Sequence, residues 1–165
     1  LDLPPETLEE LRAAARRSDT RRRGASMASG RMLSKKELTE RLTKKGASPD
    51  DAAETADWLE DLGAVDDTAY AGVIVRHYGA MGCGAARVRQ ELHRRGVPKE
   101  LWDEALEQLP PPQEAIEKFL CAKLRGRPLT PEDSRRLAAA LQRRGFSWQD
   151  IRPILNGLGQ EIDET

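Results

Sequence analysis

The sequence predicts an all-α fold of three tandem three-helix units, forming an elongated, curved array. The phrase leucine, any residue, two basic residues, glycine occurs three times, at Leu42–Gly46, Leu92–Gly96 and Leu141–Gly145, so its glycines are 50 and 49 residues apart. A fixed period of this length is typical of repeat proteins, whose single units are too small to bury a core alone. No stretch alternates apolar and polar residues for long enough to predict a strand.

Each repeated phrase predicts the end of a helix. An apolar residue lies four positions before each leucine, at Leu38, Val88 and Leu137, so each pair forms one stripe on a helix. Two basic residues then occupy the last turn, where they interact favourably with the negative end of the helix dipole. The glycine suits the left-handed conformation that commonly terminates a helix.

The segments around the first phrase predict an N-terminal extension and a unit with one weak helix. Residues 3–17 have the pattern of a separate amphipathic helix, opened by two prolines. Residues 21–32 contain glycines and serines, so we expect a weak, partly disordered first helix there. A capping box at Ser34–Glu37 starts the helix that ends in the first phrase. Ser48, followed by proline, starts the next helix.

The second and third units follow the same order. Residues 66–80 and 113–124 carry apolar residues at helical spacing and predict the first helix of each unit. Thr130, followed by proline, starts the helix that ends in the third phrase. The triple proline Pro110–Pro112 marks the joint between the two units.

The helices that follow the phrase glycines share apolar positions six and ten residues past the glycine. These are Ala52 and Ala56, Trp102 and Leu106, and Ile151 and Leu155. The residues of the first unit are smaller, so we expect its later Trp58, Leu59 and Leu62 to fill its core. The expected division is an extension (1–20), three units (21–63, 64–110 and 111–157) and a polar tail (158–165) that frays.

Composition favours a repeat protein over a compact α/β enzyme, because aromatic residues make up 4% of the chain and charged residues 33%. The net charge is −1, but the charges are unevenly distributed. Residues 12–45 contain twelve Lys or Arg and three Asp or Glu, whereas residues 46–68 contain eight Asp or Glu and no Lys or Arg. Such asymmetry can steer a charged partner, or it can form a solvated surface.

The sequence predicts neither catalysis nor a cofactor, because no nucleophile stands beside a base at a known motif spacing. The histidines and Cys83 and Cys121 lack metal-ligand spacing, so we expect no metal site. The two cysteines are expected to be reduced thiols of a cytoplasmic protein. No apolar run approaches the roughly 20 residues of a membrane helix, and we expect no signal peptide.

Basic residues at the helix ends are the main candidates for binding a partner. In a regular array, equivalent helix ends would form a row of positive charge that suits a phosphate backbone or a filament. Alternatively, they only offset the helix dipole, at about 0.3–1 kcal/mol each. The candidates are Lys44, Lys45, Arg76, Arg87, Arg89, Arg94, Arg95, Arg143 and Arg144.

The aromatic residues are expected in the core, because most lie on the apolar face of a predicted helix. Stacking on nucleic-acid bases is the alternative. They are Trp58, Tyr70, Trp102, Phe146 and Trp148.

One block of the sequence resembles the RecX family of recombination regulators. It consists of Asp66-Asp67-x-x-Tyr70-Ala71, then Val75-Arg76, then Gly82-x-Gly84-x-x-Arg87-Val88-Arg89-x-Glu91-Leu92, then Gly96-Val97-Pro98. The resemblance extends more weakly over about residues 31–156. It is incomplete at Ala64 and Val65, where the family usually carries an aromatic residue, and residues 1–30 have no clear counterpart.

The resemblance implies a cytoplasmic bacterial protein with three tandem three-helix units. It implies binding to the RecA recombinase and the RecA–DNA filament, and modulation, in the inhibitory direction, of ATP hydrolysis and strand exchange. We further expect a monomer that binds DNA weakly and no membrane. One alternative is a helical-repeat nucleic-acid-binding module without a recombinase partner. Another is a protein scaffold that docks through acidic residues 50–67.

Overall fold

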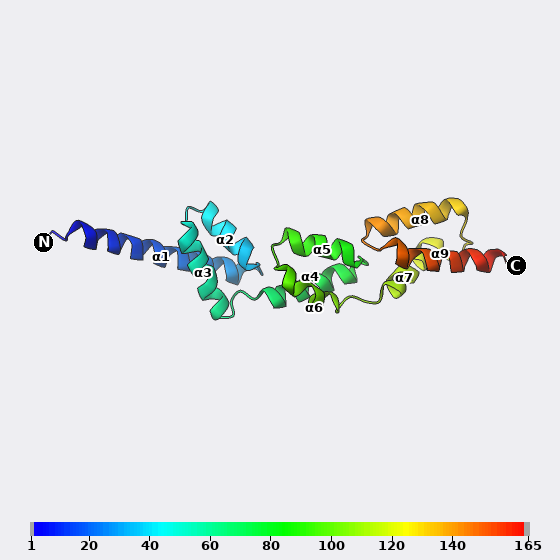
Figure 1. Cartoon of the computed structure of the whole chain (residues 1–165), viewed down its shortest axis with the longest axis horizontal. Helices are drawn as coiled ribbons and strands as arrows, with labels where there is room; N and C mark the ends of the chain where they lie inside the picture. Colours follow the sequence, from blue (N-terminus) through cyan, green and yellow to red (C-terminus); the bar gives the residue numbers. More distant parts are fainter. Residues whose placement is uncertain (1, 164–165) are drawn as a thin grey trace. The chain divides into compact units, whose positions relative to one another are not determined.

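The structure, a computed structural model, describes residues 2–163, with side chains described as far as Gly159. This part of the chain contains nine α-helices, one short 3-10 helix and no strand, which confirms the all-α prediction (Figure 1). The chain divides into two compact units. Unit 1 comprises the residues up to Tyr70 together with Arg95–Lys99, and unit 2 comprises Ala71–Arg94 and the residues from Glu100 onward.

Unit 1 is built on three helices, α1 (Pro5–Gly30), α2 (Lys35–Lys44) and α3 (Pro49–Asp61). Ser34 and Glu37 form the predicted capping box at the start of α2. The core of the unit lies between these helices and contains Leu33, Leu38, Leu42, Ala52, Ala56, Leu59 and Val65. Leu62, predicted to help fill this core, is instead exposed.

The prediction of two separate segments before α2 was wrong, because α1 runs unbroken through both. Gly24 suggested a weak helix, yet it is buried where α1 meets α3. A Cβ atom there would lie 2.6 Å from Cγ2 of Thr55, so the glycine permits close helix packing. Arg21 adds a hydrogen bond of 2.8 Å to Glu54. Packing therefore outweighs the roughly 1 kcal/mol that glycine costs a helix.

The remaining helices are α4 (Asp67–Ala80), α5 (Ala85–Arg94), η1 (Lys99–Leu101), α6 (Trp102–Leu106), α7 (Pro112–Leu124), α8 (Pro131–Arg143) and α9 (Trp148–Asp163). The Thr130 side chain caps α8 by accepting a hydrogen bond from the Asp133 amide, as predicted. Helix α9 extends to Asp163, so it includes most of the predicted tail, and the last two residues of that tail lie outside the described residues.

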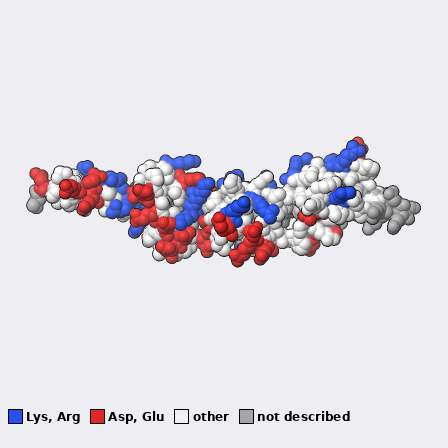
Figure 2. Space-filling view, in the orientation of Figure 1, with Lys and Arg blue, Asp and Glu red and all other residues white. Residues whose placement is uncertain are grey.

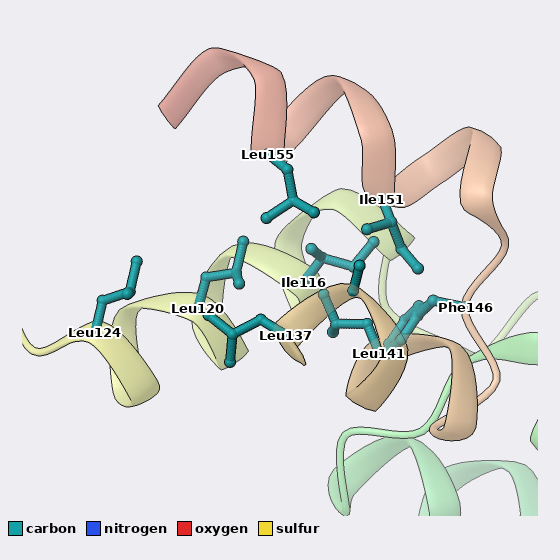
Figure 3. Close-up of a cluster of buried hydrophobic side chains, with 9 residues drawn as sticks. Ile116, Leu120, Leu124, Leu137, Leu141, Phe146, Ile151 and Leu155 are labelled. Carbon is teal, nitrogen blue, oxygen red and sulfur yellow. The ribbon is translucent and has the colours of Figure 1, made fainter. Parts of the chain in front are cut away.

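Helices α7, α8 and α9 enclose the main core of unit 2, as Figure 3 shows. Its buried residues are Ile116, Leu120, Leu124, Leu137, Ala138, Leu141, Phe146, Ile151 and Leu155. Leu137, Leu141, Ile151 and Leu155 were predicted from the apolar spacing. Burying each large aliphatic side chain contributes about 1.5–3 kcal/mol to the stability of the fold. The cluster therefore fixes the position of α8 relative to α7 and α9.

Candidate partner-binding surface

The three repeated phrases end α2, α5 and α8, as predicted. Gly46, Gly96 and Gly145 have φ angles of 102°, 77° and 101°, which confirms the left-handed helix ends. In each phrase the first basic residue is the last of its helix, and the second follows the helix end.

The second basic residue of the third phrase is held inside unit 2. Nη1 of Arg144 donates a hydrogen bond of 3.3 Å to the carbonyl oxygen of Met81. The guanidinium carbon of Arg144 also lies 4.7 Å from the ring centroid of Phe119, which is a cation–π distance. Arg144 is therefore a packing residue as well as a charge.

The main chain at the end of α8 is bound to the start of α5. The amides of Gly84 and Ala86 donate hydrogen bonds of 2.8 and 3.1 Å to the carbonyl oxygens of Arg144 and Gly145. Amides at a helix start need such acceptors. A Cβ atom on Gly145 would lie 2.4 Å from the amide nitrogen of Arg87, so this contact requires glycine. The segment around Gly84 is thus held against the end of α8 by main-chain hydrogen bonds.

The second phrase makes a similar contact in unit 1. Nη1 of Arg95 donates a hydrogen bond of 3.0 Å to the hydroxyl of Tyr70. The carbonyl oxygen of Arg95 accepts one from the Ser34 hydroxyl at the start of α2. A Cβ atom on Gly96 would lie 2.8 Å from the Lys36 side chain. Arg95, the residue after the end of α5, therefore binds both Tyr70 and the start of α2, as Arg144 binds its neighbours in unit 2.

Arg94, the first basic residue of the second phrase, pairs with a buried carboxylate. Its Nε donates a hydrogen bond of 3.2 Å to Oε2 of Glu91, whose side chain is 7% exposed. The Arg94 side chain is itself 69% exposed. Arg94 therefore compensates a buried charge and still presents a guanidinium to solvent.

The first phrase has no such docked neighbour within the described residues. A Cβ atom on Gly46 would meet no atom within 4 Å. The Lys45 carbonyl oxygen accepts a hydrogen bond of 3.1 Å from Nη1 of Arg23, while the Lys45 side chain is exposed.

Five of the nine predicted binding residues are exposed, and their side chains make no hydrogen bond or ion pair in the described part of the chain. They are Lys44, Lys45, Arg87, Arg89 and Arg143. Arg76 is also exposed but is bonded to Gln108 at 2.7 Å. Figure 2 shows Lys and Arg side chains on the visible face of both units. The predicted row of charge draws on residues of both units and stays a prediction.

The two adjacent aspartates at the start of α4 bind the amides of different helices. Oδ1 of Asp66 accepts a hydrogen bond of 3.0 Å from the Ala69 amide in α4. Oδ1 of Asp67 accepts one of 2.9 Å from the Lys35 amide in α2. Burial raises the pKa of the Asp67 carboxyl above its ordinary value, and the Lys35 amide opposes this shift.

Tyr70 completes the same contact region. Its side chain is buried, and this burial raises the pKa of its hydroxyl above the ordinary tyrosine value, while the hydrogen bond from Arg95 lowers it. Sequence reasoning missed these roles, because Tyr70 and Arg95 are distant in the chain. The signal was the Asp-Asp-x-x-Tyr block, whose spacing places Asp66 and Tyr70 one helical turn apart.

The acidic surface of unit 1 is partly neutralised by its own cations. Asp and Glu side chains gather over α3 in Figure 2. Lys35 pairs with Asp57 and, at 3.3 Å, with Glu60. The hydrogen bond to Asp57 is the largest cause that raises the pKa of the Lys35 ammonium above its ordinary value.

The aromatic residues divide between core and surface. Tyr70 and Phe146 are buried, as predicted. Trp58 is half-buried and lies under Arg21, whose guanidinium carbon is 5.1 Å from the ring centroid. Trp148 is 47% exposed, so the core prediction was wrong for this residue, which lies in the first turn of α9.

Two further features bear on function. Within residues 2–163, no helix has the length and apolar character needed to cross a membrane. Among the side chains that the structure describes, no three His, Cys, Asp or Glu are grouped where they could hold a metal ion.

Comparison with known proteins supports the family resemblance that the sequence block in α4 and α5 indicated. A family model described as RecX, second three-helix domain, matches residues 66–106. The chain is 35% identical over 123 residues to the regulatory protein RecX of Chromohalobacter salexigens. This alignment covers 74% of the chain and 81% of the relative. The chain is 32% identical over 147 residues to that of Halorhodospira halophila, covering 86% and 81%.

The fold is also that of solved RecX structures. The crystal structure of RecX from Lactobacillus salivarius superimposes with a TM-score of 0.75 at 22% identity, covering 92% of this chain and 99% of that one. The resemblance predicted from the sequence is therefore confirmed. On the identity and coverage of its relatives, this chain belongs to the RecX family of regulatory proteins.

Proposed function

We propose that this protein binds the RecA recombinase and its DNA filament, and that it inhibits RecA-catalysed ATP hydrolysis and strand exchange. Membership of the RecX regulatory family is the observation that carries this proposal. On this proposal the protein acts as a cytoplasmic, monomeric regulator without catalysis or a cofactor of its own, and it binds DNA weakly by itself.

The exposed cations at the ends of α2 and α8 and along α5 supply the contacts to the filament. Lys44 and Lys45 lie at the end of α2, and Arg143 lies at the end of α8. Arg87 and Arg89 lie nearer the start of α5. Each contact with a phosphate releases a counterion and is weak by itself, but contacts on one chain add through effective concentration.

Arg95 and Arg144 have a different role from these exposed cations. Both are bound within their own unit, Arg95 to Tyr70 and Arg144 to Met81 and Phe119. Their substitution is expected to lower the stability of the folded protein, whatever its effect on a contact with a partner. The proposed contact set is therefore centred on the five exposed cations, with Arg76 and Arg94, which are also exposed, as further members.

Occupation of the filament groove explains inhibition without any chemistry on this protein. A chain bound along the groove would exclude the second DNA from RecA. It would also bridge neighbouring RecA subunits and so hinder the motions that accompany ATP turnover.

The decisive experiment is a titration of this protein into RecA that hydrolyses ATP on single-stranded DNA. We expect hydrolysis to fall at substoichiometric to equimolar protein. Unchanged hydrolysis across that range would contradict the inhibitor proposal. A parallel measurement of binding to DNA without RecA separates the alternative, because tight binding to bare DNA would favour a nucleic-acid module that needs no recombinase.

A further inference from the structure

Unit 2 contains a cavity of about 550 Å³, and of its lining residues only Arg76 belongs to the proposed filament contacts. It lies among the end of α4, the proline segment after α6, the exposed side of α7, and Arg144. Cavities of this size hold small ligands or single large side chains. The apolar part of its lining consists mainly of Met81, Pro110, Ala115, Phe119 and Ala122.

The charged part of the lining is strongly positive. Arg76, Lys118, Lys123 and Arg144 line the cavity, together with a single carboxylate, that of Glu114. A cavity with four cations and one acid favours an anionic occupant.

Two of these cations are held in place before any ligand arrives. Nη1 of Arg76 donates to Oε1 of Gln108 at 2.7 Å, and Nη1 of Arg144 donates to the Met81 carbonyl oxygen at 3.3 Å. A guanidinium has five N–H donors, so each arginine keeps donors for a ligand carboxylate. Binding would then cost little side-chain ordering.

The single aromatic ring in the lining is already covered by cations. The Phe119 ring centroid lies 4.7 Å from the guanidinium carbon of Arg144 and 5.7 Å from Nζ of Lys123. A nucleic-acid base needs an open aromatic face for stacking. The lining therefore suits carboxylates around an aliphatic or aromatic side chain better than it suits a single strand of DNA.

We propose that this cavity binds an acidic peptide segment of a partner protein. One large apolar side chain of the segment enters beside Ala115 and Ala122, and flanking carboxylates pair with Arg76, Lys118, Lys123 and Arg144. Arg76 and Arg144 thereby gain a recognition role for protein, separate from the phosphate contacts of the exposed helix ends. The proposal goes beyond the proposed function, and it can be tested in the absence of RecA.

The test uses the full chain and a fluorescein-labelled synthetic peptide, in which a central Leu-Phe pair is flanked on both sides by Asp and Glu. We expect saturable binding by fluorescence anisotropy. Ala122→Trp fills the cavity, and Lys118→Glu reverses one charge, so each is expected to weaken binding about tenfold or more. Arg135→Glu makes the same charge change at an exposed position of α8 outside the cavity and is expected to leave binding within about twofold.

Peptide variants separate the two parts of the recognition. Replacing the Leu-Phe pair by Ala-Ala tests the apolar anchor, and replacing the acids by Lys tests the charge; both are expected to abolish binding. Absence of binding by the acidic Leu-Phe peptide would overturn the proposal. So would binding that survives both Ala122→Trp and Lys118→Glu, with circular dichroism confirming that each variant is folded. A labelled single-stranded oligonucleotide that binds in place of the peptide, and is lost in Ala122→Trp, would also overturn it in favour of nucleic acid.

Discussion

The backbone amide of Gly84 donates a hydrogen bond of 2.8 Å to the carbonyl oxygen of Arg144. This bond joins the start of α5 to the end of α8, and it fixes the Arg144 side chain against Met81 and Phe119. The neighbouring Arg143 is exposed and makes no side-chain bond in the described range. Two adjacent arginines of one motif therefore serve different purposes, one in packing and one at the surface.

Gly145→Ala is expected to destabilise the protein by about 2–5 kcal/mol. A left-handed residue with a side chain costs about 1–2 kcal/mol, and forcing an atom into a packed contact costs about 1–3 kcal/mol more. The new Cβ would lie 2.4 Å from the backbone of Arg87, which cannot rotate away. Urea denaturation followed by circular dichroism measures the loss.

Gly46→Ala is the matched control for this prediction. Gly46 has nearly the same φ angle, 102° against 101° for Gly145, but a Cβ atom added there would have no atom within 4 Å. Its replacement should cost only the conformational part, about 1–2 kcal/mol. Equal losses at the two glycines would show that the contact with α5 contributes nothing to stability.

Arg144→Ala is expected to lower the free energy of unfolding by about 1–3 kcal/mol. The change removes a hydrogen bond and a cation–π contact, each worth roughly 0.5–1.5 kcal/mol. Arg143→Ala, one residue away and exposed, should stay within about 0.5 kcal/mol of the wild type. If both variants unfold at the same urea concentration as the wild type, Arg144 is not a packing residue.

Asp67→Asn is expected to raise stability at neutral pH. Burial raises the pKa of the Asp67 carboxyl, so the folded state binds its proton more tightly than the unfolded state does. The stability linked to this group is therefore fully present below its unfolded pKa and is lost as pH rises through the folded pKa. Asn keeps an acceptor for the Lys35 amide without the buried charge.

The advantage of Asp67→Asn should accordingly shrink as the pH falls through the raised pKa of the folded state, and it should be gone below the ordinary aspartate pKa. Urea midpoints measured for both proteins from acidic to neutral pH test this trend. A variant that is less stable than the wild type at pH 7 would show that the charged hydrogen bond to Lys35 outweighs the desolvation of the carboxylate.

The triple change Lys44→Ala, Arg89→Ala and Arg143→Ala is expected to weaken binding to RecA–DNA filaments without unfolding the protein. The slope of log affinity against log salt should become shallower by about 0.7–0.9 for each phosphate contact removed. Anisotropy titrations of labelled filaments over a range of salt concentrations measure this slope.

A second triple change, Lys99→Ala, Arg135→Ala and Arg152→Ala, controls for net charge. These three cations are also exposed but are not among the nine predicted binding residues. This variant should keep most of the affinity and of the salt slope. Equal losses of affinity in the two triple variants would show that the filament contacts are not specific to Lys44, Arg89 and Arg143.

Local patterns predicted the helix ends well. Ser34, Thr130 and the phrase glycines act within a few residues of their own position, so their side-chain type and spacing define the cap. The family resemblance came from such patterns too. The continuity of α1 was not predictable in this way, because Gly24 is favourable only when Thr55 of α3 lies against it.

The candidate surface was predicted less completely than the helices. The sequence predicted nine cations as binding residues. The residues next to them in the chain did not reveal which of the nine bind other parts of the protein. Arg95 and Arg144 are distinguished by Tyr70 and Phe119, which lie 25 residues away along the chain in each case. Distant partners of this kind, and the cavity beside Phe119, depend on tertiary packing and leave no periodic signal in the sequence.

The junction between α8 and α5 consists mainly of peptide groups, with glycine required at two points. Main-chain donors and acceptors are supplied by almost any residue type. Side chains around this junction can therefore be substituted over evolutionary time while the helices keep their packing. Such a junction is compatible with a fold shared at 22% identity with the protein from Lactobacillus salivarius.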